Sequence, residues 1–228
     1  GMSQDGLAAL EPAFVDERAG IMQWSFEYLQ RSGEGDPDER TWLRDETGGS
    51  VYLRLSTNPI DQPGKRVDDD FRQGAIDGAY WLRKPGPNCA YQGVVAPEAI
   101  RAASMISEGR RDVAVLAVTS ADRLNAGWTA AQRARARGNA NARSHAETLL
   151  GNLSRDCKII TVIDGHPATL AWLGSVIGHQ AVSLGVEHFG QTGTIADLYS
   201  HFGIDAEGIV EKVNGLTAGR MLSRPLPR

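Results

Sequence analysis

Residues 112–118, which read DVAVLAV, decide the fold class of this chain. A short and almost unbroken apolar run of this kind is typical of a strand that is covered on both faces within a parallel sheet. Residues 158–163, KIITVI, repeat the pattern further along the chain. Segments with helical spacing follow both runs, so we expect strands and helices to alternate.

The alternation extends outward from these two runs. The predicted strands are residues 50–56, 79–83, 91–96, 112–118, 158–163 and 181–186. The predicted helices are residues 15–30, 97–106, 120–137, 144–153, 166–176, 193–202 and 205–213. Such an order predicts an α/β fold, with a mostly parallel sheet and helices on both of its faces.

Two of these helices carry additional signals. Ser144, followed three residues later by Glu147, predicts a capping box at the start of its helix. In the first helix, apolar and small side chains recur every three or four residues and predict one buried face. That face is expected to contain Ile21, Trp24, Ser25, Tyr28 and Leu29.

The amino-acid composition limits the classes of function that this chain can have. The 228 residues hold 24 Lys and Arg against 28 Asp and Glu, a net charge of −4, and can form one large domain or two small ones. This charge excludes a general nucleic-acid binder, which needs a basic surface. No apolar run approaches the ~18 residues of a membrane span, and no signal peptide is predicted. Two cysteines, Cys89 and Cys157, form no disulfide framework, so a reducing cytoplasm is the expected compartment.

The first candidate site is the loop after residues 158–163, because ligands of parallel sheets bind beyond the carboxyl ends of strands. Asp164 and His166 stand there, directly before a predicted helix. They can act as an acid–base pair or hold a ligand at the start of the helix. The structural alternative is that Asp164 caps the helix and Pro167 is its first-turn proline.

The second candidate site is the loop after residues 181–186, with Glu187, His188 and Gly190. His188 can reach the active site of a partner, whereas the structural alternative is a plain strand-to-helix turn with Thr192 as the helix cap. Gly190 permits a backbone conformation that other residues resist. The five histidines form no HxH or HExxH pair, and no glycine-rich phosphate loop or GxSxG is present. No catalytic, cofactor-binding or metal-ligating residue is therefore assigned.

Six sequence segments, in this order and spacing, carry a resemblance to a known family. They are EPAFVDERAGIM (11–22), VYLRLST (51–57), RQGAIDGAYWLRK (72–84), LAVTSADRL (116–124), LGVEHFG (184–190) and DLYSHFGIDAEGIV (197–210). With them the chain resembles the carboxy-terminal part of the thiamine-diphosphate enzymes of the transketolase superfamily. It is most similar to the homodimeric decarboxylating component of pyruvate dehydrogenase and to related transketolase-like proteins.

The resemblance implies a division of the chain. Residues 1–64 would be a remnant of the pyrimidine-binding domain, made of a helix, a polar loop and a strand. Residues 65–71, a charged segment with three consecutive aspartates, are predicted from composition to be a linker. Residues 72–218 would then be a transketolase carboxy-terminal-like domain. That domain is expected to have three layers around a five-stranded mixed sheet, with residues 79–83 as its one antiparallel strand. Residues 219–228 would be a tail.

The resemblance also implies where the cofactor would bind. Thiamine diphosphate and Mg²⁺ belong to the full-length family enzyme, and the diphosphate fingerprint begins with GDG. Here Ile163-Asp164-Gly165 lacks the first glycine and lies in the wrong domain, so no cofactor site is expected in this chain. Transketolases proper carry an arginine for the substrate phosphate where this chain has Thr57 or Asn58. The absence of this arginine favours a 2-oxoacid over a sugar phosphate as the substrate.

These expectations leave three hypotheses about function. The first is a carboxy-terminal structural and interface domain of a thiamine-diphosphate-dependent transketolase or 2-oxoacid dehydrogenase component, inactive alone. It would form a homodimer or bind a partner chain that carries the thiamine-diphosphate domains. The second is a stand-alone small-molecule-binding or regulatory protein that kept the fold without catalysis. The third is a self-sufficient enzyme that uses Asp164, His166 and His188.

Overall fold

The computed structural model describes residue 4 and residues 6–33, 45–56, 59–64, 67–84, 90–91, 95–109 and 113–222. The chain divides into two compact units, each built from two separate segments. Unit 1 comprises Gly1–Leu82 and Ala117–Asn152. Unit 2 comprises Arg83–Leu116 and Leu153–Arg228. The division into domains that the family resemblance implies stays a prediction.

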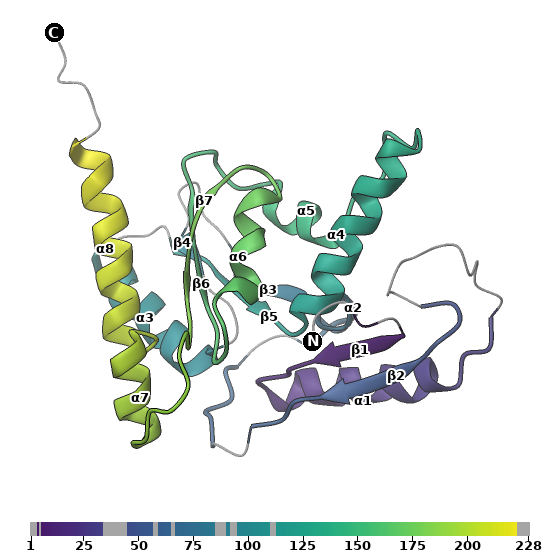
Figure 1. Ribbon diagram of the computed structural model, residues 1–228, viewed down its shortest axis with the longest axis horizontal. Coiled ribbons are helices and arrows are strands. Elements are labelled where there is room, and N and C mark those ends of the chain that lie inside the picture. The colour runs from purple at the N-terminus through teal and green to yellow at the C-terminus, as the bar shows by residue number, and fades with distance from the viewer. Residues whose placement is uncertain are drawn as a thin grey trace, which may run out of the picture. The chain divides into compact units, whose positions relative to one another are not determined.

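The described elements alternate between strands and helices (Figure 1), which confirms the predicted α/β class. In chain order they are β1 (Leu7–Leu10), α1 (Val15–Leu29), β2 (Ser50–Leu53), α2 (Asp69–Asp77), β3 (Ala79–Arg83), β4 (Ala90–Tyr91), α3 (Ala96–Gly109), β5 (Val115–Val118), α4 (Ala121–Ala136), α5 (His145–Leu150), β6 (Lys158–Val162), α6 (Ala168–Ala171), the 3₁₀ helix η1 (Trp172–Ser175), β7 (Gln180–Leu184), α7 (Ile195–Phe202) and α8 (Ala206–Leu222).

In unit 1, β1 and β2 form a parallel pair whose register runs from Leu7 opposite Ser50 to Leu10 opposite Leu53. The strands are packed against α1, which lies beside them in Figure 1. Their shared core contains Ala8, Leu10, Ile21, Trp24 and Tyr28. Four of the five residues expected on the inner face of α1 are buried, but Leu29 is 52% exposed. Placing Leu29 on that face was therefore wrong.

The helix α2 begins directly after an N-cap residue, Asp68. The carboxylate of Asp68 accepts a hydrogen bond from the Phe71 N–H at 2.9 Å, as an N-cap residue does. The helix ends at Gly78, whose φ of 107° lies in the left-handed region that favours glycine. Residues 69–71, which the charged composition assigns to a linker, thus open a helix. Residues 65 and 66 of that segment lie outside the described residues.

The second segment of unit 1 begins at the end of β5 and contains α4 and α5. Ser120 caps α4 by accepting a hydrogen bond from the Arg123 N–H at 3.1 Å. Its hydroxyl also donates to the Ala9 carbonyl at 2.5 Å, which connects this cap with β1. Ser144 and Glu147 form the predicted capping box at the start of α5.

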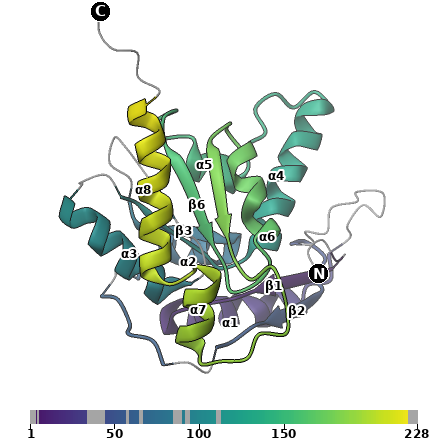
Figure 2. The same cartoon turned by 60° about the vertical axis from the view of Figure 1, so that its left-hand side comes forward.

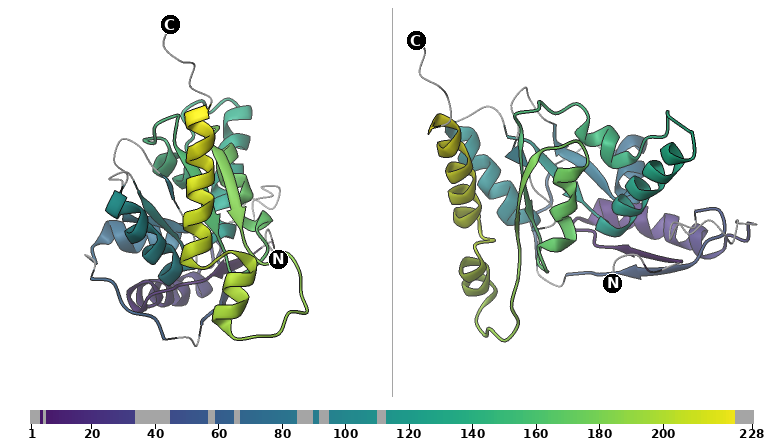
Figure 3. Two further views of the ribbon diagram at one scale, coloured as in Figure 1. Left: turned by 90° about the vertical axis from the view of Figure 1, so that its left-hand side faces the viewer. Right: turned by 45° about the horizontal axis from the view of Figure 1, so that its top comes forward.

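Unit 2 is a three-layer arrangement. The strands β4, β6 and β7 form a parallel sheet with β6 in the centre. Figures 2 and 3 show α3 and α8 on one face of β6 and β7, and α6 on the other. Arg101 of α3 pairs with Glu207 of α8, and Glu98 accepts a hydrogen bond from the Ala206 N–H at 2.8 Å.

Several predicted details differ from the structure. The described strands form sheets of two, two and three strands, with β3 beside β5, so the five-stranded sheet is not confirmed. The strand β1 was not predicted, because the alanines of LAAL have little β propensity. Thr194 rather than Thr192 caps α7. The helix α8 extends to Leu222, into the expected tail, of which residues 223–228 lie outside the described residues.

Candidate functional site

The two loops singled out by sequence follow neighbouring strands of unit 2. The strands β6 and β7 are parallel and in register from Lys158 opposite Gln180 to Val162 opposite Leu184. Both therefore end at the same edge of the sheet. Beyond that edge, the Val186 N–H donates to the Gly165 carbonyl at 2.8 Å. The loop with Asp164 and the loop with Glu187 thus start side by side, as the alternation predicts.

Gly185 allows this close approach of the two loops. A Cβ atom at this position would lie 2.4 Å from the Gly165 carbonyl oxygen and 3.0 Å from the Pro167 nitrogen. Both neighbours are backbone atoms, which cannot rotate away as the end of a flexible side chain would. Any other residue at position 185 would force the two loops apart.

In the first loop, His166 contacts the start of α6. The Nδ1 atom of His166 accepts a hydrogen bond from the Ala168 N–H at 3.2 Å. Pro167 is the N-cap residue of α6, so the expectation that Asp164 caps this helix with Pro167 as its first residue is wrong. The imidazole satisfies the N–H of the first residue of this helix. Asp164 and His166 are both exposed.

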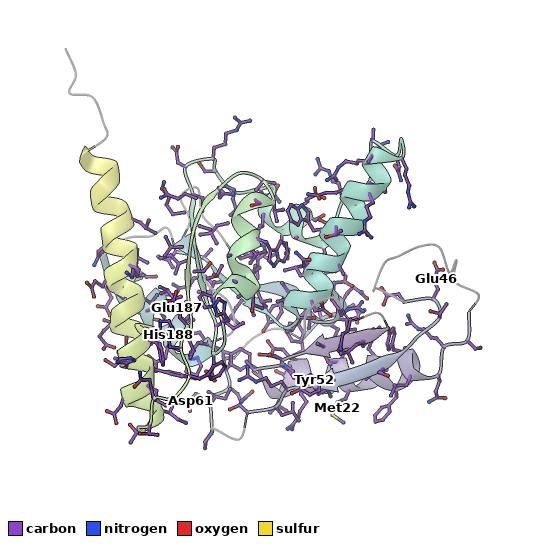
Figure 4. The ribbon with its side chains drawn as sticks, viewed as in Figure 1. Met22, Glu46, Tyr52, Asp61, Glu187 and His188 are labelled. Carbon is purple, nitrogen blue, oxygen red and sulfur yellow. The ribbon has the colours of Figure 1, made fainter. Side chains whose placement is uncertain are left out.

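The second loop is open to solvent along its length. Glu187, His188 and Gly190 are exposed, and the Phe189 side chain is 100% exposed. The φ of Gly190 is 102°, which agrees with the conformational role expected for this glycine. Figure 4 labels Glu187 and His188 between β7 and α7. Among the described residues, neither of these two side chains forms a hydrogen bond or an ion pair.

These loops therefore present polar side chains and one apolar ring to solvent. The described residues contain no hydrogen bond between the Asp164–His166 pair and the Glu187–His188 pair, so they form no preassembled acid–base system. No group of three or more His, Cys, Asp or Glu that could hold a metal ion occurs within the part of the chain that the structure describes. An exposed aromatic ring on a solvated loop suits contact with another molecule better than it suits chemistry.

Two polar residues that the sequence did not identify are buried in unit 1. Glu17 is 1% exposed and accepts hydrogen bonds from the Ala13 and Phe14 N–H groups at 2.6 and 2.8 Å and from the Tyr80 hydroxyl at 2.6 Å. Arg123 is 6% exposed, and its guanidinium stacks 4.5 Å from the centre of the Trp24 ring. The Glu17–Tyr80 and Arg123–Trp24 contacts join residues that are distant in sequence, so no local pattern could have found them, whereas the Glu17 bonds to Ala13 and Phe14 are a local cap.

The exposed side of α1 carries a further apolar pattern. Val15, Ala19, Met22, Phe26 and Leu29 are spaced by four, three, four and three residues and are all exposed on α1. This spacing is typical of a helix face that packs against another helix. Thr57 and Asn58, which the family resemblance compares with a substrate-binding arginine, lie outside the described residues. Within the described residues, no helix has both the length and the apolar character needed to cross a membrane.

No family model and no curated protein matches this sequence. Solved structures do match. The transketolase from Leishmania mexicana superimposes with a TM-score of 0.61 at 16% identity, over 97% of this chain and 27% of that one. A transketolase variant from Pichia stipitis gives a TM-score of 0.57 at 16% identity, over 93% and 25%. A split gene transketolase, described as an inactive β4 tetramer, gives 0.53 at 15%, over 92% and 58%.

The chain therefore has a transketolase-like fold. It spans about a quarter of the length of the transketolases from Leishmania mexicana and Pichia stipitis and 58% of the split gene chain. At such low identity the likeness establishes the fold and no activity.

Proposed function

We propose that this chain is a carboxy-terminal structural and interface domain of a thiamine-diphosphate-dependent enzyme of the transketolase type. The observation that supports the proposal is the unequal coverage of the structural match. Nearly the whole chain, 93%, superimposes on a transketolase, but it accounts for only 25% of that protein. The remaining parts of such an enzyme would come from another polypeptide segment or a partner chain.

The loop with Glu187, His188 and Gly190 would have an interface role in this assembly. Its side chains are exposed and unpaired among the described residues, and Phe189 offers a large apolar contact. A partner that covers this loop would bring His188 to the entrance of an active site built by other residues. Between the two reaction classes, 2-oxoacid decarboxylation is favoured over ketol transfer, because Thr57 or Asn58 replaces the expected arginine.

Thiamine diphosphate binds through its diphosphate and a Mg²⁺ ion, which needs several oxygen ligands in one place. The described residues offer no group of three or more His, Cys, Asp and Glu for such an ion. The proposal therefore assigns no reaction step to this chain alone. Its proposed contribution is to support and cover a site held elsewhere in the assembly.

Calorimetric titration of the purified chain with thiamine diphosphate and Mg²⁺ tests this proposal. We expect no heat of binding and no turnover of pyruvate or of ketose phosphates. A matched run with Mg²⁺ alone controls for weak ion binding at acidic patches. Saturable binding in the micromolar range would contradict the proposal, because a cofactor site would then exist within these 228 residues.

A further inference from the structure

The second half of α4 and its connection to α5 carry charge of one sign. Residues 123–146 include five arginines and neither an aspartate nor a glutamate. The rest of the chain holds all 28 Asp and Glu but only 19 of the 24 Lys and Arg. Soluble proteins ordinarily mix both signs on their surfaces, whereas a region of one sign attracts partners of the opposite sign. This separation of charge indicates a surface for electrostatic contact.

Three of the five arginines form an exposed patch together with two asparagines. We call this patch the basic tip and define it by Arg133, Arg137, Asn139, Asn141 and Arg143, all of which are exposed. Figure 1 shows the connection between α4 and α5 at the end of α4 that is far from β1. The patch therefore lies on an open end of unit 1.

The backbone of the basic tip is held by its own hydrogen bonds. The Gly138 and Asn139 N–H groups donate to the Arg135 and Ala134 carbonyls, both at 3.0 Å. The Ala142 N–H donates to the Asn139 carbonyl at 3.1 Å. The φ of Gly138 is 101°, in the left-handed region that favours glycine. A surface on such a defined turn loses little conformational freedom when a partner binds.

Arg135 fastens this turn to α5. Its guanidinium donates to the Ala142 carbonyl at 2.6 Å and to the Glu147 carboxylate at 2.8 Å. The Nε2 atom of His145 lies 2.7 Å from the Ala79 carbonyl oxygen, which connects α5 with β3. The charge of Arg135 is thus already paired, and the arginines of the basic tip start from a fixed backbone.

Arg137 and Arg143 have no carboxylate beside them. Among the described residues, neither side chain forms a hydrogen bond or an ion pair. A cation near the last turn of a helix offsets the negative end of its dipole, and this structural role accounts for Arg133 and Arg137. It does not account for Arg143, which directly precedes the Ser144 cap of α5. A cation there faces the positive end of a helix, where an anion is the stabilising charge.

The side chains of the basic tip fit carboxylates. A guanidinium presents two parallel N–H donors to the two oxygens of one carboxylate, and the amides of Asn139 and Asn141 can donate further hydrogen bonds. Nucleic acids fit less well, since residues 129–144 contain no Phe, Trp or Tyr on which a base could stack. The 28 carboxylates elsewhere in the chain would also repel a long polyanion, but not a short segment confined to the tip.

We propose that the basic tip is a docking surface for an acidic segment of a partner protein, in which several Asp or Glu residues lie close together in sequence. The inference goes beyond the proposed function, because it concerns a different surface from the loop with His188. It requires neither the absence of a cofactor site nor a particular reaction, so either proposal can fail without the other.

Fluorescence anisotropy with labelled octaglutamate as the probe tests this surface. At ~50 mM salt, where exposed charges are less strongly screened, we expect saturable binding to the unaltered chain that weakens as salt is added. The variant R137E/R143E should bind at least about tenfold more weakly, because it reverses two charges of the tip. The control R18E/K212E makes the same change in net charge at exposed positions of α1 and α8 and should bind like the unaltered chain. Circular dichroism and the melting temperature should agree for all three chains, since none of the four positions is buried.

The variant R137K/R143K separates the paired donors of arginine from its charge. Lysine keeps the charge but not the fork, so this variant should bind with an affinity between those of the unaltered chain and R137E/R143E. No binding to the unaltered chain, unchanged binding to R137E/R143E, or an equal loss in R18E/K212E would each overturn the inference. An oligothymidylate of equal charge that binds the tip more tightly than octaglutamate does would also overturn it, in favour of a nucleic-acid surface.

Discussion

Glu17 shows how a single buried charge organises unit 1. One carboxylate oxygen accepts hydrogen bonds from two N–H groups at the start of α1, and the other accepts from the Tyr80 hydroxyl of β3. Burial, followed by the neighbouring Glu17 carboxylate, raises the pKa of Tyr80. The phenol therefore keeps its proton and remains a donor to Glu17 throughout the physiological range.

Two substitutions of Glu17 should differ in their effect on stability. In Glu17→Gln the amide oxygen can still accept from the helix N–H groups, and the NH₂ group can donate to the Tyr80 oxygen. Glu17→Ala removes the cap and leaves the buried Tyr80 hydroxyl without its acceptor. We expect the alanine variant to lower the free energy of unfolding by about 2–4 kcal/mol, and the glutamine variant by about 1 kcal/mol. Urea unfolding measures both.

Tyr80→Phe provides the matched control for the glutamate series. It removes the hydroxyl but retains the ring, which packs edge-on against Phe71 at 4.7 Å between ring centres. If the Glu17–Tyr80 contact stabilises unit 1, the effect of Tyr80→Phe should be smaller in the Glu17→Ala background than in the unaltered chain. Fully additive effects would show that the contact contributes nothing.

At the scale of elements, the start of α5 is stabilised by charge. Partial burial acts to raise the pKa of Glu147, but hydrogen bonds from Arg135 and Ser144, together with the charge of Arg135, outweigh it and lower this pKa. The Arg135 Nη2 to Glu147 Oε1 distance is 2.8 Å. The ionised carboxylate therefore joins the end of α4 to the start of α5.

This lowered pKa predicts a pH dependence with a definite sign. The folded state holds the Glu147 carboxylate ionised below its ordinary pKa of 4.5, so its contribution to stability is complete above that pH. It is lost as the pH falls through the lower pKa of the folded state. In unfolding measurements between pH 3 and 7, the advantage of the unaltered chain over Glu147→Gln should shrink below about pH 4.5.

Glu211→Gln, at an exposed position of α8, serves as the control for a general charge effect. Its difference from the unaltered chain should stay nearly constant over the same pH range. A Glu147→Gln difference that is equally flat would contradict the stabilising role of the ionised carboxylate.

Elements whose signals are local were predicted well. The Ser144–Glu147 box depends on residues three apart, and it is present. The Asp68 cap is equally local, but the three consecutive aspartates suggested an exposed boundary instead of the first turn of α2. Leu29 was assigned to the wrong face of α1 because both faces are apolar, and the spacing rule alone cannot say which of them is covered within one chain.

The sequence predicted which two loops form the candidate site, but not the contacts within them. Parallel strands place Asp164 and Glu187 on adjacent loops, and the sequence sufficed for that. It could not show that the His166 ring would satisfy the start of α6, or that Gly185 would lie against the Gly165 carbonyl. Both depend on ångström-scale backbone positions that are set by the packing of the whole unit.

At the scale of the whole molecule, the two compact units cross the boundary that the family resemblance implies. Unit 1 combines the supposed remnant with residues up to Leu82 and with Ala117–Asn152. A chain that begins at residue 65 would lose β1, α1 and β2. It would also lose Glu17 opposite Tyr80 and the Ala9 carbonyl that accepts from Ser120.

We expect this shortened chain to bind a hydrophobic dye and to lose the near-ultraviolet circular dichroism of its aromatic residues, because the apolar side chains around Tyr80 would be uncovered. Dye binding and thermal unfolding measure this directly. A chain that starts at residue 5 serves as the control and should unfold like the parent. If residues 65–228 instead unfold cooperatively and bind no dye, the family-based division would describe the folding unit better than the compact units do.

The interleaved path of the chain has a consequence for its biosynthesis. A ribosome adds about 5–20 residues per second, so seconds pass between the appearance of Leu82 and that of Asn152, which completes unit 1. During this interval α1 lacks the Arg123 side chain of α4, which stacks on the Trp24 ring in the folded chain. Chaperones that recognise nascent apolar helices would find the outer side of α1 accessible, because β1 and β2 already cover its inner face.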